Sequence, residues 1–219
     1  MARPNVTLKI ATSMDGRIAL ANGVSQWITC SQSRARVHEM RRDHSAVLVG
    51  SGTVLADDPL LTARTVPIPS RQPVRIVADS QARIPVSGRL IQSASLGKVV
   101  IAAAQPDGQA VASLEKAGAD VWRCGGTDGQ VSPPRLLDRC EVEGLESIFL
   151  EGGGALAASF VRAGLIDTIQ WFRAPIIIGG DGLPAIAALG FSEITSAPRW
   201  RTSATERIGD DVLETYIKA

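Results

Sequence analysis

Short apolar runs alternate along the chain with segments in which apolar and polar residues follow a helical spacing. Apolar runs of about four to eight residues between glycine, proline or serine are typical of buried strands. We expect strands at residues 6–11, 46–50, 74–78, 98–103, 121–123, 147–150 and 168–172. We expect helices at residues 31–43, 106–118, 133–140 and 155–163, the first with Ala35, Val37 and Met40 on its inner side. This alternation predicts an α/β fold with a mostly parallel central sheet flanked by helices.

The C-terminal part of the chain follows a different pattern. Residues 200–207 and 212–217 are expected to pair as antiparallel strands that turn at Gly209-Asp210. This C-terminal antiparallel hairpin makes the predicted sheet a mixed one. No segment has the composition of a linker, so we predict a single domain over residues 1–219.

A polar segment directly after the expected strand at 46–50 carries two adjacent carboxylates, Asp57 and Asp58, and then Arg64. Open α/β sheets bind their ligands at the carboxyl ends of the strands. The pair is therefore a candidate for a general acid or for a group that orients a substrate. The default alternative is that these carboxylates cap a helix or a turn before Pro59.

The run Glu151-Gly152-Gly153-Gly154 follows another expected strand and opens a helix. Glycines let the backbone approach a ligand closely, and the amino end of a helix favours an anion such as a pyrophosphate. Ala157 takes the last place of a dinucleotide-binding fingerprint, and the run lies late in the chain instead of in the first strand-helix turn. Nucleotide binding and a simple tight turn both stay open.

Several single residues are candidates with an ordinary alternative. Lys9 lies in an expected strand, where a lysine usually faces water and a buried one is often functional. Core packing is the default role of Trp27. Arg41, Arg42 and Arg64 can bind a phosphate through paired hydrogen bonds, although solvation at the surface is the default for any one of them.

The composition excludes several classes of protein. The chain has 219 residues, 45% hydrophobic and 21% charged, with a formal net charge of +1. This small charge predicts no nucleic-acid or anionic-membrane partner. No apolar run approaches the roughly 20 residues of a membrane span, and the N-terminus lacks the apolar core of a secretory signal. Three widely spaced cysteines favour reduced thiols in a cytoplasmic protein over disulfides or a zinc site.

Other catalytic motifs are missing from the sequence. His38-Glu39 resembles the start of a zinc-protease helix, but Arg42 occupies the place of the second histidine. The zinc signature of nucleobase deaminases, the nucleophile elbow of hydrolases and the Walker phosphate loop do not occur. We therefore expect no metal site.

Taken together, six motifs resemble the reductase half of the bacterial bifunctional riboflavin-biosynthesis deaminase/reductase. They occur in the family's order and are LKIATSMDG at 8–16, SQWIT at 25–29, GTVLADDP at 52–59, LTAR at 61–64, RIVADS at 75–80 and EGGG at 151–154. No single motif is specific, whereas the ordered set is.

This resemblance implies a dihydrofolate-reductase-like α/β domain, commonly a homodimer, that binds NADPH. It also implies an oxidoreductase whose substrate is a small phosphorylated pyrimidine, 5-amino-6-(5-phosphoribosylamino)uracil. The product would be 5-amino-6-(5-phosphoribitylamino)uracil, because an imine-like carbon of the ring-opened sugar takes a hydride from the nicotinamide. The protein supplies orientation, charge and exclusion of water.

The resemblance also implies residue roles. The polar groups expected nearest the chemistry are Lys9, Asp57 and Glu151, among which the proton donor stays open. The residues expected to bind substrate are Ser25, Arg41, Leu61, Arg64 and Glu151. The residues expected to bind cofactor are Ala11, Trp27, Thr53, Asp57, Ser80, Gly153, Gly154, Ala155 and Leu156. For the 2′-phosphate of NADPH, Ser80 and Arg83 are candidates.

Three alternatives stay open. The family's deaminase half has no counterpart here, so the chain is either a free-standing reductase or a part of a longer protein. Its substrate is the deaminated uracil, the undeaminated diaminopyrimidinone that fungal and archaeal relatives reduce, or a pterin-like heterocycle. A non-catalytic nucleotide-binding relative is the remaining alternative.

Overall fold

The computed structural model divides into two compact units of the chain. The structure describes residues 3–219. Unit 1 contains residues 3–5 and His38–Phe149, and unit 2 contains Val6–Val37 and Leu150–Ala219. The chain passes from unit 2 to unit 1 within helix α1 (Ser31–Asp43) and returns within strand β7 (Ser147–Glu151). The single domain expected over residues 1–219 stays a prediction.

Parallel strands form the core of unit 1. They are β3 (Ala46–Gly50), β4 (Val74–Ala78), β5 (Val99–Ala103) and β6 (Asp120–Arg123), paired in that order. The apolar side chains of β3, β4 and β5 are buried on both faces, which explains why the sequence shows apolar runs here instead of alternation. The helices of this unit are α2 (Ser51–Asp57), α3 (Arg89–Gln92), α4 (Gly108–Lys116) and α5 (Pro133–Val142), with a 3-10 turn, η1, at Ala94–Leu96.

The carboxyl ends of these strands lie level with one another. In the register, Gly50 pairs with Ala78, Ala78 with Ala102, and Ala103 with Arg123. The segments that follow β3, β4, β5 and β6 therefore leave the sheet at one edge. This edge carries the first turn of α2, directly after β3, and Ser80, directly after β4, where parallel sheets place ligand-binding residues.

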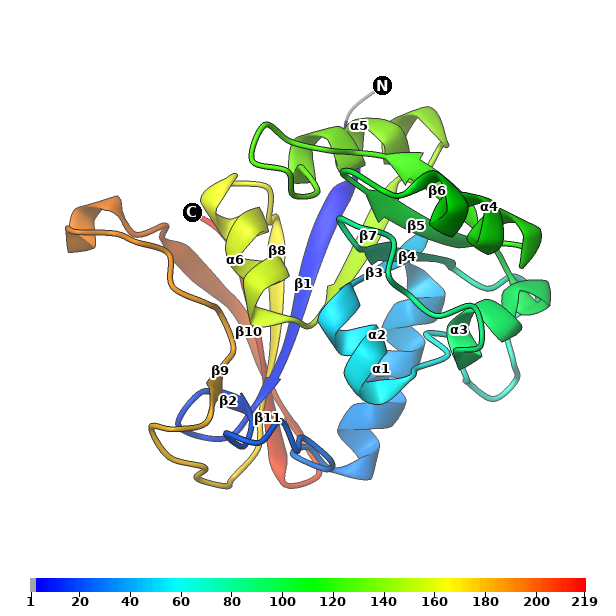
Figure 1. Cartoon of the computed structure of the whole chain (residues 1–219). Helices are drawn as coiled ribbons and strands as arrows, with labels where there is room; N and C mark the ends of the chain where they lie inside the picture. The colour runs from blue at the N-terminus through cyan, green and yellow to red at the C-terminus, as the bar shows by residue number, and fades with distance from the viewer. Residues whose placement is uncertain (1–2) are drawn as a thin grey trace. The chain divides into compact units, whose positions relative to one another are not determined.

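Unit 2 has a mixed set of strands. β1 (Asn5–Thr12) pairs in parallel with β8 (Thr168–Arg173), and β8 pairs antiparallel with β11 (Asp211–Lys218). β11 forms a long hairpin with β10 (Trp200–Ile208), which Figure 1 shows at the red end of the chain. The other elements are β2 (Arg17–Ala19), β9 (Leu183–Pro184), α6 (Gly154–Arg162) and a 3-10 turn, η2, at Ile194–Ser196.

Asp15 fixes the loop that follows β1. Its carboxylate accepts hydrogen bonds from Ser13 Oγ at 2.6 Å, Ile178 N at 3.0 Å and Gly179 N at 2.7 Å. These bonds, the Ser13 bond first, hold the pKa of the Asp15 carboxyl well below its ordinary value. The motif SMDG thus has a structural role, because it ties residues 13–16 to the segment before β9.

Helix α1 confirms both predicted boundaries, residues 31 and 43, and corrects the predicted inner face. Val37 is buried, but Ala35 is exposed, so the expectation that it faces inward was wrong. Ser33 is buried in its place because its Oγ donates to Asp211 Oδ2 at 2.6 Å. The same oxygen accepts from Cys30 N at 2.8 Å, so Asp211 anchors the start of the helix.

The predicted α/β class is confirmed, with mostly parallel strands, flanking helices and a C-terminal antiparallel hairpin. The sequence patterns missed the short elements α2, α3, β2 and β9. No helix within residues 3–219 is both long enough and apolar enough to cross a membrane.

Candidate active site

The adjacent carboxylates Asp57 and Asp58 have different roles at the end of α2. Asp58 has left-handed backbone (φ 40°), and its N–H donates to Val54 O at 3.0 Å. Its Oδ1 accepts from Arg89 N at 2.7 Å, so the capping alternative describes Asp58. Within residues 3–219, the carboxylate of Asp57 has no hydrogen-bond or ion-pair partner. Asp57 is therefore the carboxylate that is available to a ligand.

The surroundings of Asp57 favour its protonated form. The residue is exposed overall, yet desolvation by the neighbouring protein raises the pKa of its carboxyl above the ordinary value of 3.8. A carboxyl with a raised pKa is better suited to hold and deliver a proton than an unperturbed one.

Hydrogen bonds and burial hold the loop after Asp58 in unit 1. Leu61 is buried with left-handed backbone (φ 56°). Ala63 N donates to Gln72 Oε1 at 2.8 Å, and Gln72 Nε2 donates to Ala63 O at 3.1 Å. Arg41 Nη1 donates to Thr62 O at 3.2 Å, which ties helix α1 to the same loop.

Arg64 extends from this loop towards His38 and lies near the cations Arg41 and Arg89. Its backbone N lies 3.3 Å from His38 Nδ1, and its Nη2 lies 3.2 Å from His38 Nε2. A neutral imidazole has only one acceptor nitrogen, so only one of these two contacts is a hydrogen bond at a time. Burial, followed by the charges of Arg41 and Arg89, lowers the pKa of the Arg64 guanidinium. Such a gathering of cations favours a phosphate ligand.

Ser80 organises the carboxyl edge of the unit 1 strands. Its Oγ donates to Gln130 Oε1 at 3.1 Å and accepts from Val131 N at 3.1 Å, so its single hydroxyl proton is in use. Arg83 lies 3.6 Å from the buried Asp79 carboxylate and is otherwise exposed. Of the two residues considered for a 2′-phosphate, Arg83 therefore has the available donors.

In unit 2, Lys9 lies on the face of β1 that it shares with Thr7 and Ala11. Its Nζ is 6.0 Å from the centroid of the Phe172 ring, and the residue is half-buried. In the register it lies beside Gln170, whose Oε1 accepts from Thr215 Oγ1 at 3.1 Å. Lys9 thus belongs to a polar row on the sheet and is not a fully solvated lysine.

The strand β7 ends at the glycine-rich turn that the sequence singled out. Glu151 is only 8% exposed. Gly152 and Gly153 have positive φ angles, 74° and 84°, which favour glycine. Gly153 caps the amino end of α6 without any side-chain cap, so the first-turn amides of this helix can bind an anion.

Gly154 allows a close approach of two backbone segments. A Cβ at this position would lie 2.8 Å from Pro184 O and 3.3 Å from Ala187 N. Ala187 N donates to Gly154 O at 3.0 Å. The segment after β9 therefore packs directly on the glycine turn, and any side chain at Gly154 would displace it.

Trp27 is exposed, which makes its default role in core packing wrong. The residue is 69% exposed, and the guanidinium carbon of Arg34 lies 4.4 Å from the centroid of its ring. Arg34 Nη1 donates to Thr29 O at 2.5 Å, which fixes the stacked pair. An exposed indole held on one face by a cation can stack with a planar ligand ring on the other. The half-buried Ser25 precedes it in the same segment.

Comparison with known families shows to which protein family the chain belongs. The model of the RibD C-terminal domain matches residues 4–213. The chain belongs to the RibD C-terminal domain family. The dihydrofolate-reductase-like type of fold that the motifs implied is thereby confirmed.

Relatives of the RibD family differ in length. The riboflavin biosynthesis protein RibD of Actinobacillus pleuropneumoniae is 37% identical over 217 residues, 98% of this chain and 57% of that protein. The chain thus spans little more than half the length of this relative. A protein of Methanothermobacter thermautotrophicus is also 37% identical, and 98% of each chain is covered. It is named 2,5-diamino-6-ribosylamino-4(3H)-pyrimidinone 5′-phosphate reductase.

A solved RibD-type structure has the same fold. It is the diaminohydroxyphosphoribosylaminopyrimidine deaminase/5-amino-6-(5-phosphoribosylamino)uracil reductase of Thermotoga maritima. It superposes with a TM-score of 0.80 at 27% identity, covering 99% of this chain and 57% of that one.

The predicted site residues of this RibD-family chain divide between the units. Unit 1 holds Arg41, Thr53, Asp57, Leu61, Arg64 and Ser80. Unit 2 holds Lys9, Ala11, Ser25, Trp27, Glu151, Gly153, Gly154, Ala155 and Leu156. Their roles in binding and catalysis stay predictions.

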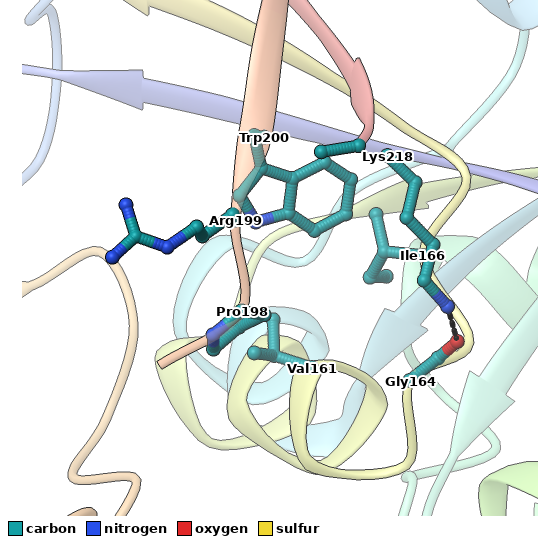
Figure 2. Close-up of a pocket in the computed structure, with 8 residues that line it drawn as sticks. Val161, Gly164, Ile166, Pro198, Arg199, Trp200 and Lys218 are labelled. Carbon is teal, nitrogen blue, oxygen red and sulfur yellow. Dashed lines mark hydrogen bonds between the residues drawn. The ribbon is translucent and has the colours of Figure 1, made fainter. Parts of the chain in front are cut away.

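A cavity in unit 2 contains none of these residues. It has a volume of about 180 Å³ and lies between the C-terminal part of α6 and the ends of the β10–β11 hairpin. In Figure 2 the Arg199 side chain points away from the other lining residues. Lys218 Nζ donates to Gly164 O at 3.0 Å, so its amine is already engaged. This cavity is not the candidate active site.

Sequence reasoning missed two arginines, Arg34 beside Trp27 and Arg89 beside Asp58. For Arg34 a signal was available, because it lies in the first turn of the expected helix, five residues after the SQWIT motif. For Arg89 no local signal existed, because its partner lies 31 residues earlier.

Replacing Gly154 by alanine is expected to weaken NADPH binding about tenfold, because the turn must shift to relieve the 2.8 Å contact with Pro184 O. Binding is measured by nicotinamide fluorescence, and folding by the melting temperature. Gly108→Ala is the matched control, since Gly108 also begins a helix but a Cβ there meets nothing within 4 Å. Unchanged NADPH affinity in a folded Gly154→Ala variant would favour the simple tight turn.

Proposed function

We propose that this chain is an NADPH-dependent oxidoreductase of riboflavin biosynthesis. Its proposed reaction reduces 5-amino-6-(5-phosphoribosylamino)uracil to 5-amino-6-(5-phosphoribitylamino)uracil. The observation that carries the proposal is the match to the RibD C-terminal domain across residues 4–213. The available Asp57 carboxylate and the arginines around residues 58–64 support it, because they suit a phosphorylated substrate.

The residues present fit a dinucleotide. Helix α6 begins without a side-chain cap, which suits a pyrophosphate at its amino end. The exposed Trp27 ring suits a planar ring of the cofactor. Arg83 is the proposed donor to a 2′-phosphate, which would favour NADPH over NADH. When bound, the nicotinamide supplies the hydride for the reduction.

The side chains supply orientation, charge and a proton. Arg41 and Arg64 hold the substrate's phosphate, which positions the sugar carbon to be reduced. Reduction of an imine-like carbon also requires a proton on the neighbouring nitrogen. Asp57 is the proposed donor, because its raised pKa favours the protonated form. Lys9 and Glu151 are proposed to orient the sugar hydroxyls and the pyrimidine.

The undeaminated pyrimidinone is a second candidate substrate. It is favoured by the relative of equal length, which is named a diaminopyrimidinone phosphate reductase and is 37% identical. The uracil is favoured by the Thermotoga maritima structure, whose name includes uracil reductase. Both substrates carry the same phosphorylated sugar, so the arginines would serve either one.

The test measures loss of reduced-nicotinamide absorbance with each of the two pyrimidines. We expect turnover with the deaminated uracil and faster turnover with NADPH than with NADH. Turnover with the pyrimidinone alone would move the chain to the second candidate. NADPH binding without consumption with either pyrimidine or with a pterin would favour a non-catalytic nucleotide-binding relative.

We also propose that the protein is a cytoplasmic homodimer, as the family resemblance implies. Sedimentation equilibrium of the purified chain at several concentrations tests the oligomeric state, with a mass near twice 23.1 kDa expected. A constant monomer mass would contradict it.

A further inference from the structure

Arg89 contacts the loop of residues 58–64, which carries Arg64. It is the first residue of α3, and its backbone N donates to Asp58 Oδ1 at 2.7 Å. A Cβ on the preceding Gly88 would lie 3.3 Å from the same oxygen, so the two segments touch. The backbone of Arg89 is therefore fixed relative to residues 58–64.

The side chain of Arg89 is not used in the fold. The residue is exposed, and its guanidinium makes no hydrogen bond or ion pair with any part of the chain between residues 3 and 219. Only its backbone bonds to Asp58. A ligand can therefore take up all of its side-chain donors, and its replacement leaves the Asp58 contact intact.

Several arginines gather around this loop. Arg89 acts on Arg64 together with Arg41, since both of their charges add to burial in lowering the pKa of Arg64. Arg75 is 0% exposed, and its Nη1 donates to Leu60 O at 3.2 Å on the same loop. No ion pair within the described part of the chain includes Arg64, Arg75 or Arg89. Cations gathered in this way repel one another until an anion binds.

We propose that Arg89 is a third guanidinium ligand of the substrate's phosphate, alongside Arg41 and Arg64. This inference rests on the proposed function, and it adds a residue that determines the preference for phosphorylated over dephosphorylated substrate. Guanidinium groups bind phosphate through paired hydrogen bonds, and three of them match the three free oxygens of a phosphate monoester. The cofactor's 2′-phosphate is the competing anion, for which Arg83 is the proposed partner.

The test compares Arg89→Met with wild type. We expect KM for the phosphorylated pyrimidine to rise about tenfold or more, with kcat within about twofold, because uniform binding is lost. KM for NADPH and for the dephosphorylated pyrimidine should not change. Arg89→Lys should restore part of the loss, since it keeps the charge without the paired donors.

Arg71→Met is the matched control. Arg71 is an exposed arginine of the same unit whose charge is not among those that act on Arg64. An equal rise in KM for Arg71→Met would attribute the effect to net charge and overturn the proposal. A rise in KM for NADPH alone would also overturn it, because the arginines would then bind the cofactor.

Inorganic phosphate binding separates this inference from the proposed function. Titration calorimetry of wild type and Arg89→Met needs no turnover. If neither pyrimidine is reduced but phosphate binds wild type about tenfold more tightly, Arg89 is a phosphate ligand and the proposed function fails. If wild type reduces the uracil while both phosphate affinity and KM are unchanged in Arg89→Met, the proposed function stands and this inference fails.

Discussion

Replacing Asp57 by asparagine is expected to lower kcat/KM for the pyrimidine about 100-fold or more. Asparagine keeps the shape of the side chain but cannot donate or accept a proton at the operating pH. Within residues 3–219 the carboxylate has no partner, so the substitution removes no structural contact. NADPH oxidation with the uracil substrate measures the loss.

The same variant is expected to be slightly more stable than wild type at neutral pH. Desolvation raises the folded-state pKa of the Asp57 carboxyl, so its contribution to stability is present at low pH and is lost as pH rises through that pKa. The melting-temperature advantage of Asp57→Asn should therefore grow between about pH 4 and pH 7. We expect a gain no larger than about 0.5 kcal/mol, because the residue is exposed.

Asp58→Asn is the adjacent control. An amide oxygen can still accept the hydrogen bond from Arg89 N, so this variant should retain most of its activity. Equal loss in the two variants would show that the pair acts through local structure. Full activity of Asp57→Asn would remove Asp57 from the chemistry and leave Lys9 and Glu151 as proton donors.

Replacing Arg75 by methionine is expected to destabilise the protein by about 3 kcal/mol. The side chain is 0% exposed and donates to Leu60 O, Ser93 Oγ, Ser93 O and Gly97 O. Methionine leaves the buried acceptors of Ser93 and the half-buried carbonyls of Leu60 and Gly97 without their donor, at about 1 kcal/mol for each buried acceptor. Removal of a buried charge offsets part of this, since burial lowers the pKa of the Arg75 guanidinium.

Thermal and urea unfolding measure this loss, which for a chain of this size corresponds to a melting temperature lower by roughly 6–12 °C. Arg123→Met is the control, because Arg123 is exposed at the end of β6.

We also expect weaker substrate binding in Arg75→Met, since Leu60 precedes the loop of Leu61 and Arg64. Arg75→Lys keeps the charge and is the milder variant if Arg75→Met does not fold. Unchanged stability would mean that the cost of burying the charge equals the worth of its hydrogen bonds.

Local sequence patterns determined the regular elements. β3 and β4 lie where their apolar runs predicted them, because glycine, serine or proline bounds each run. The turn at Gly152-Gly153 could also be predicted from the sequence, since only glycine adopts these positive φ angles readily. Helix α2 was missed because its seven residues are too few to show a helical period.

Tertiary contacts decided the features that distinguish one polar residue from another. The sequence could not separate Asp57 from Asp58, and the contact of Asp58 with Arg89 N, 31 residues away, does so. Ser33 is buried in place of Ala35 because Asp211 lies beside it, 178 residues later in the chain. Hydrophobic periodicity reports which face of an element is buried on average. Partners this distant in sequence meet only after the elements pack, so the local pattern carries no record of them.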